Sequence, residues 1–179
     1  MRSDALLAFI PIGAPLSVVG GTGVNFQSQV IDLMGVGVGI APPNIIGTRS
    51  LFGTDFGIGD DRPLLDIVTG TALATSNSAT LNVQLQGAPD TASTYQPGTW
   101  QTFIETGTLT AAQCGATTRI GRFDIPAAFP ELTLPRYLRL NFAVPASTNF
   151  TAGTIAFAIV TTIRDDYAVA SAAKNFTVI

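Results

Sequence analysis

The sequence predicts an all-β domain, from its composition and from the spacing of its apolar residues. Only 12% of the 179 residues are charged, with a single lysine and two glutamates, so residues that favour exposed helices are scarce. The 18 glycines and 11 prolines are spread along the whole chain, as expected for many short strands joined by turns. Two segments also alternate between apolar and polar residues, which is the period of a half-buried strand.

These two segments are the clearest strands. In residues 79–86 the apolar positions are Leu81, Val83 and Leu85, and in residues 136–144 they are Leu138, Leu140, Phe142 and Val144. Five further strands are expected at 24–31, 64–71, 99–105, 119–125 and 154–163, each bounded by Gly, Pro or Asn. Such a series predicts two packed antiparallel sheets, a jelly-roll-like β-sandwich.

The expected organisation is one sandwich domain over 24–163, with an N-terminal arm (1–23) and a C-terminal arm (164–179). Within the domain, residues 33–61 are expected to form a long irregular loop, because glycines interleave with apolar residues there. A long loop rich in apolar residues indicates a segment that docks on another surface. For the C-terminal segment, a last strand or short helix of the domain itself is the alternative.

The chain lacks the side chains that most catalytic and metal sites need. It contains no histidine, which excludes Ser-His-Asp and Cys-His catalysis and histidine metal ligation. The pairs Asp60–Asp61 and Asp165–Asp166 lack the spacing of a calcium loop and are interpreted as solvated turns. The glycines at 20–23 and 35–39 fit no phosphate-binding motif. We therefore expect no enzymatic activity, no metal and no cofactor.

Charge and hydropathy point towards a protein partner. The net charge of −3 and the absence of any cluster of cations argue against nucleic acid. No apolar run approaches the roughly 20 residues that span a membrane, so a membrane partner is not expected either. Because 46% of the residues are hydrophobic and mean hydropathy is +0.39, part of the apolar surface is expected to meet protein. Cys114, the single cysteine, is expected to be a buried thiol.

Candidate contact residues are apolar residues outside the periodic strands. They are Leu6 and Phe9 in the N-terminal arm, Ile45, Phe52 and Phe56 in the long loop, and Phe176 and Val178 in the C-terminal arm. Trp100 is interpreted as a core anchor, with a ligand platform as the alternative. Arg136, Arg139 and Arg164 can form bidentate bonds across an interface, or pair within the chain with Asp124, Asp165 or Asp166.

An ordered set of motifs resembles the cement, or decoration, proteins of tailed bacteriophage capsids. They are DFGIGDDRPLLDIVTGTAL, TLNVQLQGAPD, ELTLPRYLRLNFAVP and FTAGTIAFAIVT, and together they cover most of residues 55–162. The resemblance implies a jelly-roll-like sandwich that forms a small homo-oligomer, a dimer or trimer. It also implies binding to the major capsid protein on the outside of the assembled shell.

The predicted function is therefore a structural virion protein, made in the bacterial cytoplasm, that stabilises the shell without catalysis. Two alternatives stay open. A carbohydrate-binding sandwich would show an exposed groove of Trp and Tyr side chains, and another head or tail protein of a phage would be present in few copies per virion.

Overall fold

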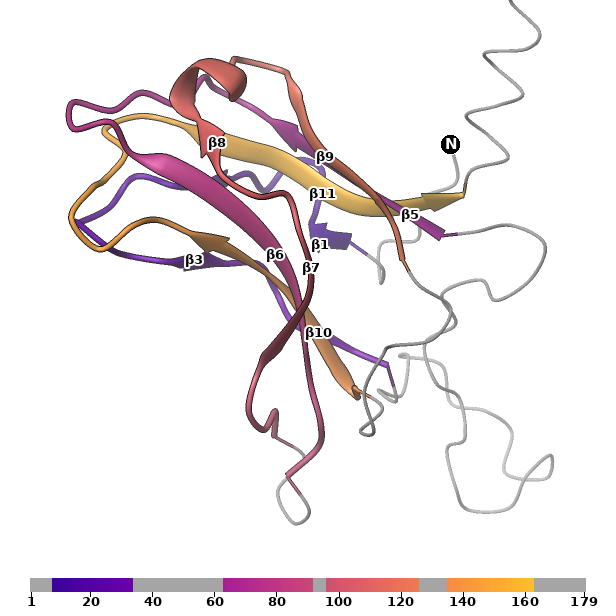
Figure 1. Cartoon of the computed structure of the whole chain (residues 1–179). Helices are drawn as coiled ribbons and strands as arrows, with labels where there is room; N and C mark the ends of the chain where they lie inside the picture. Colours follow the sequence, from indigo (N-terminus) through magenta and orange to yellow (C-terminus); the bar gives the residue numbers. More distant parts are fainter. Residues whose placement is uncertain (1–7, 34–62, 92–95, 126–134, 163–179) are drawn as a thin grey trace, which may run out of the picture.

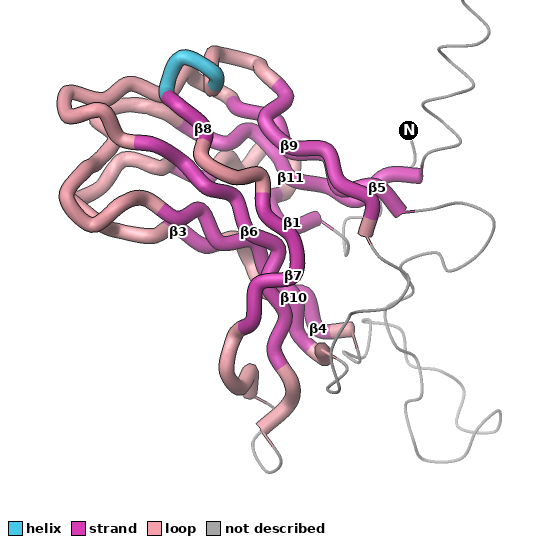
Figure 2. The backbone as a smooth tube through the Cα atoms, in the orientation of Figure 1, coloured by secondary structure: helices cyan, strands magenta, loops and turns pink. Residues whose placement is uncertain are grey.

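The computed structural model describes residues 8–33, 63–91, 96–125 and 135–162. In these residues the chain forms two antiparallel sheets packed together, which confirms the predicted all-β sandwich (Figure 1). One turn of 3-10 helix, Ala111–Gln113, accompanies the strands (Figure 2).

The first sheet is built around the last strand of the described chain. Its order is β1 (Ala8–Ile10), β11 (Thr154–Thr162), β5 (Pro63–Thr69) and β9 (Arg119–Asp124), and β2 (Leu16–Ser17) also pairs with β11. The register places Ile159 opposite Ala8 on one side and opposite Asp66 on the other.

The second sheet is built around the two strands with the clearest alternation. Its order is β3 (Phe26–Gln27), β10 (Tyr137–Ala143), β6 (Thr80–Ala88) and β7 (Gln101–Glu105). The short strands β4 (Ile31–Asp32) and β8 (Leu109–Thr110) pair with β10 and β6 respectively. Leu140 lies opposite Leu85, so the apolar positions of the two strands share one face.

The chain passes repeatedly from one sheet to the other. Several strands act in pairs: β1 and β2 both lie along β11, β3 and β4 both lie along β10, and β7 and β8 both pair with β6. Apart from the step from β6 to β7, each of these units lies in the sheet opposite the one before it. This alternation, with the first unit beside the last strand, is the connectivity of a jelly-roll-like sandwich.

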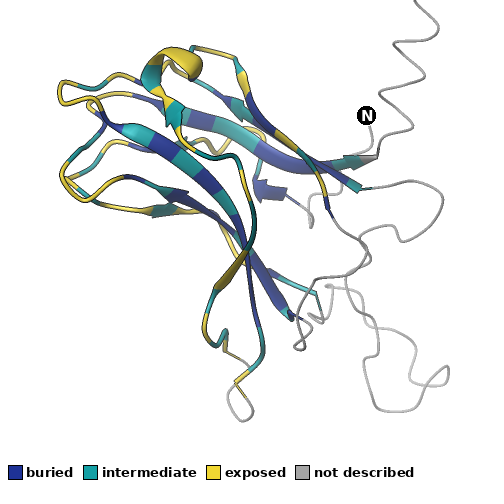
Figure 3. Ribbon diagram, viewed as in Figure 1, coloured by how far each residue is buried: buried dark blue, intermediate teal, exposed yellow. Residues whose placement is uncertain are grey.

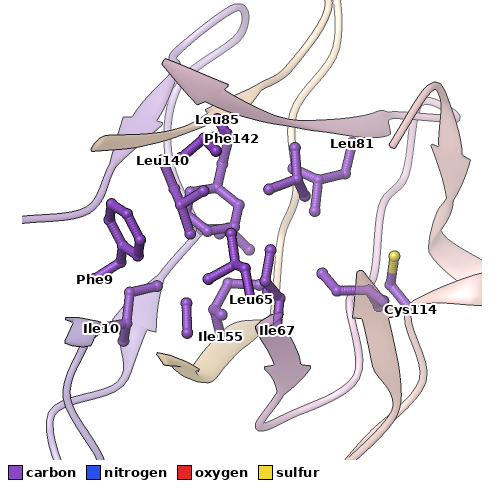
Figure 4. Close-up of a cluster of buried hydrophobic side chains, with 14 of the residues drawn as sticks. Phe9, Ile10, Leu65, Ile67, Leu81, Leu85, Cys114, Leu140, Phe142 and Ile155 are labelled. Carbon is purple, nitrogen blue, oxygen red and sulfur yellow. The ribbon is translucent and has the colours of Figure 1, made fainter. Parts of the chain in front are cut away.

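The core lies between the two sheets. Partly buried and buried residues alternate from Thr80 to Leu85 along β6, as the pattern of the sequence predicts, and the rest of the strand is buried (Figure 3). The core-facing side chains include Leu65, Ile67, Leu81, Leu85, Leu140, Phe142 and Ile155 (Figure 4). Gly87 sits where a Cβ atom would come within 2.1 Å of the Phe103 ring, so this position of β6 has no room for a side chain.

Most of the expected strands are present, with shifted ends. The expected strands at 64–71, 79–86, 99–105, 119–125, 136–144 and 154–163 correspond to β5, β6, β7, β9, β10 and β11. The expected strand at 24–31 is instead divided into β3 and β4, both of which pair with β10. Strands β1, β2 and β8 were not predicted, since each is only two or three residues long.

The structure corrects the N-terminal boundary of the domain. Residues 8–23 do not form a separate arm, because β1 and β2 are strands of the first sheet. Phe9 is completely buried within the core rather than available to a partner, so its prediction as an interface residue is wrong (Figure 4). Three consecutive residues of β1 are buried, and a segment of that length carries no period that sequence reasoning could use.

Candidate interaction surfaces

The acidic side chains and the cysteine of the described residues are not arranged for metal binding. No group of three or more Cys, Asp or Glu side chains within them could hold a metal ion. Cys114 is fully buried, and burial raises the pKa of its thiol from 9.0 to about 11, which removes it as a nucleophile near neutral pH. In the same part of the chain, no helix is long and apolar enough to cross a membrane.

Residues 8–33, which we call the N-terminal edge, run along one side of both sheets. Strands β1 and β2 extend the first sheet beyond β11, and β3 and β4 extend the second beyond β10. The backbone N–H of Gln29 donates to the carbonyl oxygen of Phe9 at 3.2 Å, and its side-chain amide donates to the carbonyl oxygen of Ala8. One segment therefore closes this side of the sandwich.

This edge also carries exposed apolar side chains. Among the described residues, the large hydrophobic side chains that are exposed are Ile12, Val19, Val24 and Val30, and all four belong to the N-terminal edge. Ile12 is the most open, with 67% of its surface accessible. They lie in the connections between the short edge strands, from the β1–β2 connection to the β3–β4 connection, and not on the strands themselves. Because the exposed large apolar side chains are confined to this edge, it is the part of the described surface that we favour for contact with another protein.

The opposite side, which we call the distal edge, comprises residues 101–125. It contains β7, β8, the 3-10 turn and β9, and apart from two alanines its exposed residues are polar or charged, including Glu105, Arg119, Arg122 and Asp124. Arg119 Nε donates to Asp66 Oδ1 at 2.6 Å, and the Asp66 side chain is only 8% exposed. An ion pair with one buried partner thus holds β9 against β5.

A second ion-pair cluster lies at one end of the second sheet. Arg136 makes a bidentate pair with Asp32, with both N–O distances at 2.9 Å, and its third nitrogen donates to Asp90 Oδ2 at 2.6 Å. These hydrogen bonds, Asp32 first, raise the pKa of Arg136. The cluster joins β4, the end of β6 and the start of β10, so Arg136 pairs within the chain and with partners that sequence analysis did not name.

Beside this cluster, Tyr137 has a polar group without a partner. Its ring centroid lies 5.0 Å from the Arg136 guanidinium carbon. Among the described residues, its buried hydroxyl has no hydrogen-bond partner, which also holds for Asp90 Oδ1. Burial raises the pKa of the Tyr137 hydroxyl, so this group stays protonated.

The outward face of the second sheet carries a ladder of polar side chains beside the single tryptophan. Asn141 donates to Gln84 at 2.9 Å, Gln86 also donates to Gln84 at 3.3 Å, and Arg139 Nε donates to Gln86 at 2.9 Å. The Arg139 guanidinium carbon lies 4.1 Å from the centroid of the Trp100 ring. We call the set Gln84, Gln86, Trp100, Arg139 and Asn141 the polar face.

The structure overturns one of the two predicted roles of Trp100, that of a core anchor. It is partly exposed and stacks against Arg139 on the outward face, so it is not a core anchor, and a cation already covers one side of its ring. Sequence reasoning missed this pairing, because Trp100 precedes β7 whereas Arg139 lies on β10, and β6 separates these two strands in the sheet.

The other predicted contact residues lie outside the described residues: Leu6, Ile45, Phe52, Phe56, Phe176 and Val178. The same holds for Arg164 and for the pairs Asp60–Asp61 and Asp165–Asp166. The apolar side chains that the described structure does expose were not singled out by sequence analysis. They nevertheless share a signal: each lies next to a glycine or a polar residue.

No protein-family model matches the chain, and no curated protein sequence is significantly similar to it. The resemblance to capsid cement proteins therefore stays a hypothesis.

Proposed function

We propose that this chain is a structural virion protein that binds the outside of an assembled phage capsid and stabilises it without catalysis. The observation that supports this proposal best is the grouping of Ile12, Val19, Val24 and Val30 on the N-terminal edge, while the distal edge is mostly polar. The partners are the major capsid protein and a second copy of this chain. Its place is the capsid exterior, after synthesis in the host cytoplasm.

A rigid sandwich with an apolar edge suits this role because a partner that binds the edge orders few additional residues. The N-terminal edge is already tied to both sheets by backbone pairing, so few residues lose freedom when a partner covers it. A protein that binds only the assembled shell stabilises that shell by mass action. One site contributes about 2.7 kcal/mol when the free protein is at about 100 times its dissociation constant.

The carbohydrate-binding alternative depends on an open aromatic groove. Within the described residues, the Trp100 ring is covered on one side by Arg139, and Tyr137 is buried. This arrangement gives the alternative no support. The other alternative, a head or tail protein of low copy number, is separated from decoration by counting the copies bound to each particle.

The test uses expanded shells that lack the protein. Purified protein is mixed with these shells, and the bound copies are counted after sedimentation and located by electron microscopy. Ile12→Asp combined with Val30→Asp places charge on the apolar edge and should lower binding at least about tenfold, as expected for residues in the centre of an interface. The matched control is Gln101→Asp, which adds a charge at an exposed position of the distal edge.

The control should bind as the unchanged protein does, and decorated shells should melt at a higher temperature than bare shells. If the unchanged protein binds no shell, the proposed function is wrong. If the double variant binds as well as the control, the function stands but its contacts lie elsewhere.

A further inference from the structure

Arg139 projects from the outward face of β10, opposite the core-facing residues Leu138 and Leu140. Two neighbours fix its guanidinium group. The Trp100 ring lies 4.1 Å away on one side, and Gln86 Oε1 accepts a hydrogen bond from Nε at 2.9 Å. Because these contacts come from β6 and the residue before β7, the plane of the group is set by the sheet before any partner arrives.

This arginine differs in its partners from Arg119 and Arg136. Arg119 pairs with Asp66, and Arg136 pairs with Asp32 and Asp90. Within the described part of the chain, Arg139 has no carboxylate partner, and its terminal Nη1 and Nη2 groups donate to no protein acceptor. Partial burial also lowers its pKa, as expected for a cation whose lost hydration is not compensated.

The acidic side chain on the same face does not neutralise Arg139. Glu105 accepts hydrogen bonds from Asn82 at 2.9 Å and from Gln84 at 3.5 Å, at the far side of the amide ladder. In the sheet, Glu105 is paired with Gln84, whereas Arg139 is paired with Gln86 two residues further along β6. The cation and the carboxylate therefore occupy separate positions.

The hydrogen-bonding groups around Arg139 are largely in use. Gln86 accepts from Arg139 and donates to both Gln84 and Thr102, and Gln84 accepts from both Gln86 and Asn141. A sugar would need several free amide or hydroxyl groups for its hydroxyls. The hydrogen-bond donors that remain available beside Trp100 are instead the two terminal nitrogens of the Arg139 guanidinium, and two such donors match the two oxygens of a carboxylate.

We propose that Arg139, held in place by Trp100 and Gln86, is a docking point for an aspartate or glutamate side chain of a partner protein. Arginine and tryptophan are among the residue types most enriched at positions that dominate the energy of protein interfaces. A planar guanidinium that is already oriented loses little freedom when it forms two parallel bonds. This docking point depends on the polar face alone, whichever particle the partner belongs to.

Trp100 makes the proposal directly testable, because it is the only tryptophan in the chain. Its fluorescence and its indole N–H signal in a nitrogen-15 spectrum both report on this site. The probe is a blocked tripeptide, acetyl-Gly-Glu-Gly-amide, and the matched probe replaces Glu by Gln at the same ionic strength. Glucuronate and inorganic phosphate are titrated separately, to distinguish a sugar acid or a free phosphate from a protein carboxylate.

The Glu peptide should shift the Trp100 and Arg139 side-chain signals in a saturable way, and the Gln peptide should not. Arg139→Gln should weaken the binding of the Glu peptide at least about tenfold, and Arg139→Lys should recover only part of it, because lysine cannot form the bidentate pair. Arg122→Gln removes the same charge from the exposed part of β9 and should change nothing. Melting curves check that each variant is folded.

Three results would overturn the proposal. One is the absence of a saturable shift with the Glu peptide, and another is an equal shift in the Arg139→Gln protein. The third is binding of glucuronate or phosphate at least about tenfold tighter than the Glu peptide, which would assign the guanidinium to a different ligand. Because no shell is used, these outcomes are independent of whether the chain decorates capsids.

Discussion

The N-terminal edge and the distal edge close the same two sheets by different means. The N-terminal edge uses strands of two or three residues, inserts Phe9 into the core and leaves Ile12 exposed. The distal edge uses the longer strands β7 and β9, charged exposed residues and the ion pair between Arg119 and Asp66. Charged side chains on an edge disfavour association with other proteins, whereas exposed apolar side chains favour it.

The difference shows that one segment can both stabilise the fold and form a surface that is available to a partner. Within residues 8–33, buried positions such as Phe9 and Val18 stabilise the sandwich, and exposed positions such as Ile12 and Val30 do not. Substitutions on this edge should therefore separate into two classes. On the distal edge, by contrast, both the burial of Cys114 and the ion pair of Arg119 serve stability.

The largest effect is expected from Phe9→Ala in β1. Removing a fully buried phenylalanine leaves a cavity, and such substitutions lower the free energy of unfolding by about 3 to 5 kcal/mol. Urea denaturation followed by circular dichroism measures it. An unchanged free energy of unfolding would mean that β1 is not part of the sandwich, and that the N-terminal edge is an arm after all.

A smaller loss is expected from Arg119→Ala on the distal edge. The substitution leaves the buried Asp66 carboxylate without its partner, which should cost about 1 to 3 kcal/mol of unfolding free energy. Replacing both residues by leucine removes the unpaired charge and should restore much of the loss. Equal destabilisation by the single and double variants would show that the pair does not hold β9 to β5.

The buried thiol of the distal edge predicts a pH dependence. The pKa of Cys114 is about 11 in the folded chain, against an ordinary value of 9.0, so above pH 9 the unfolded chain releases this proton first. The contribution of this thiol to the free energy of unfolding is fully present below pH 9 and is lost as the pH rises through 11. The free energy of unfolding falls over this range by no more than about 1.36 kcal/mol per pH unit. Melting curves of the unchanged protein and of Cys114→Ala should diverge over this range, and parallel curves would contradict the prediction.

The smallest effect on stability is expected from Ile12→Ser. Ile12 is 67% exposed, and surface substitutions of this kind change the free energy of unfolding by no more than about 0.5 kcal/mol. Self-association, measured by analytical ultracentrifugation, should nevertheless weaken if the apolar edge meets a second copy. A loss of stability comparable to that of Phe9→Ala would remove the distinction between the two classes of residue on this edge.

The fold class and the strands with a long alternating pattern could be predicted from the sequence alone. Leu81, Val83 and Leu85 on β6, and Leu138, Leu140 and Phe142 on β10, face the core as their period of two requires. Alternation is a local property, so it is readable without knowing the neighbours. The absence of histidine is also a property of the sequence, and it excludes several classes of catalytic and metal site whatever the fold.

The contacts between residues that are distant in the sequence could not be predicted in this way, because they depend on the tertiary packing. The short strand β1 became part of the core because it pairs with β11, the last strand of the described chain. Arg136 forms an ion pair with Asp32, which is 104 positions away in the sequence. Arg139, three residues after Arg136, instead stacks on Trp100. Neither outcome follows from composition or period, because pairing between distant segments is set by how the two sheets pack and by the register of their strands.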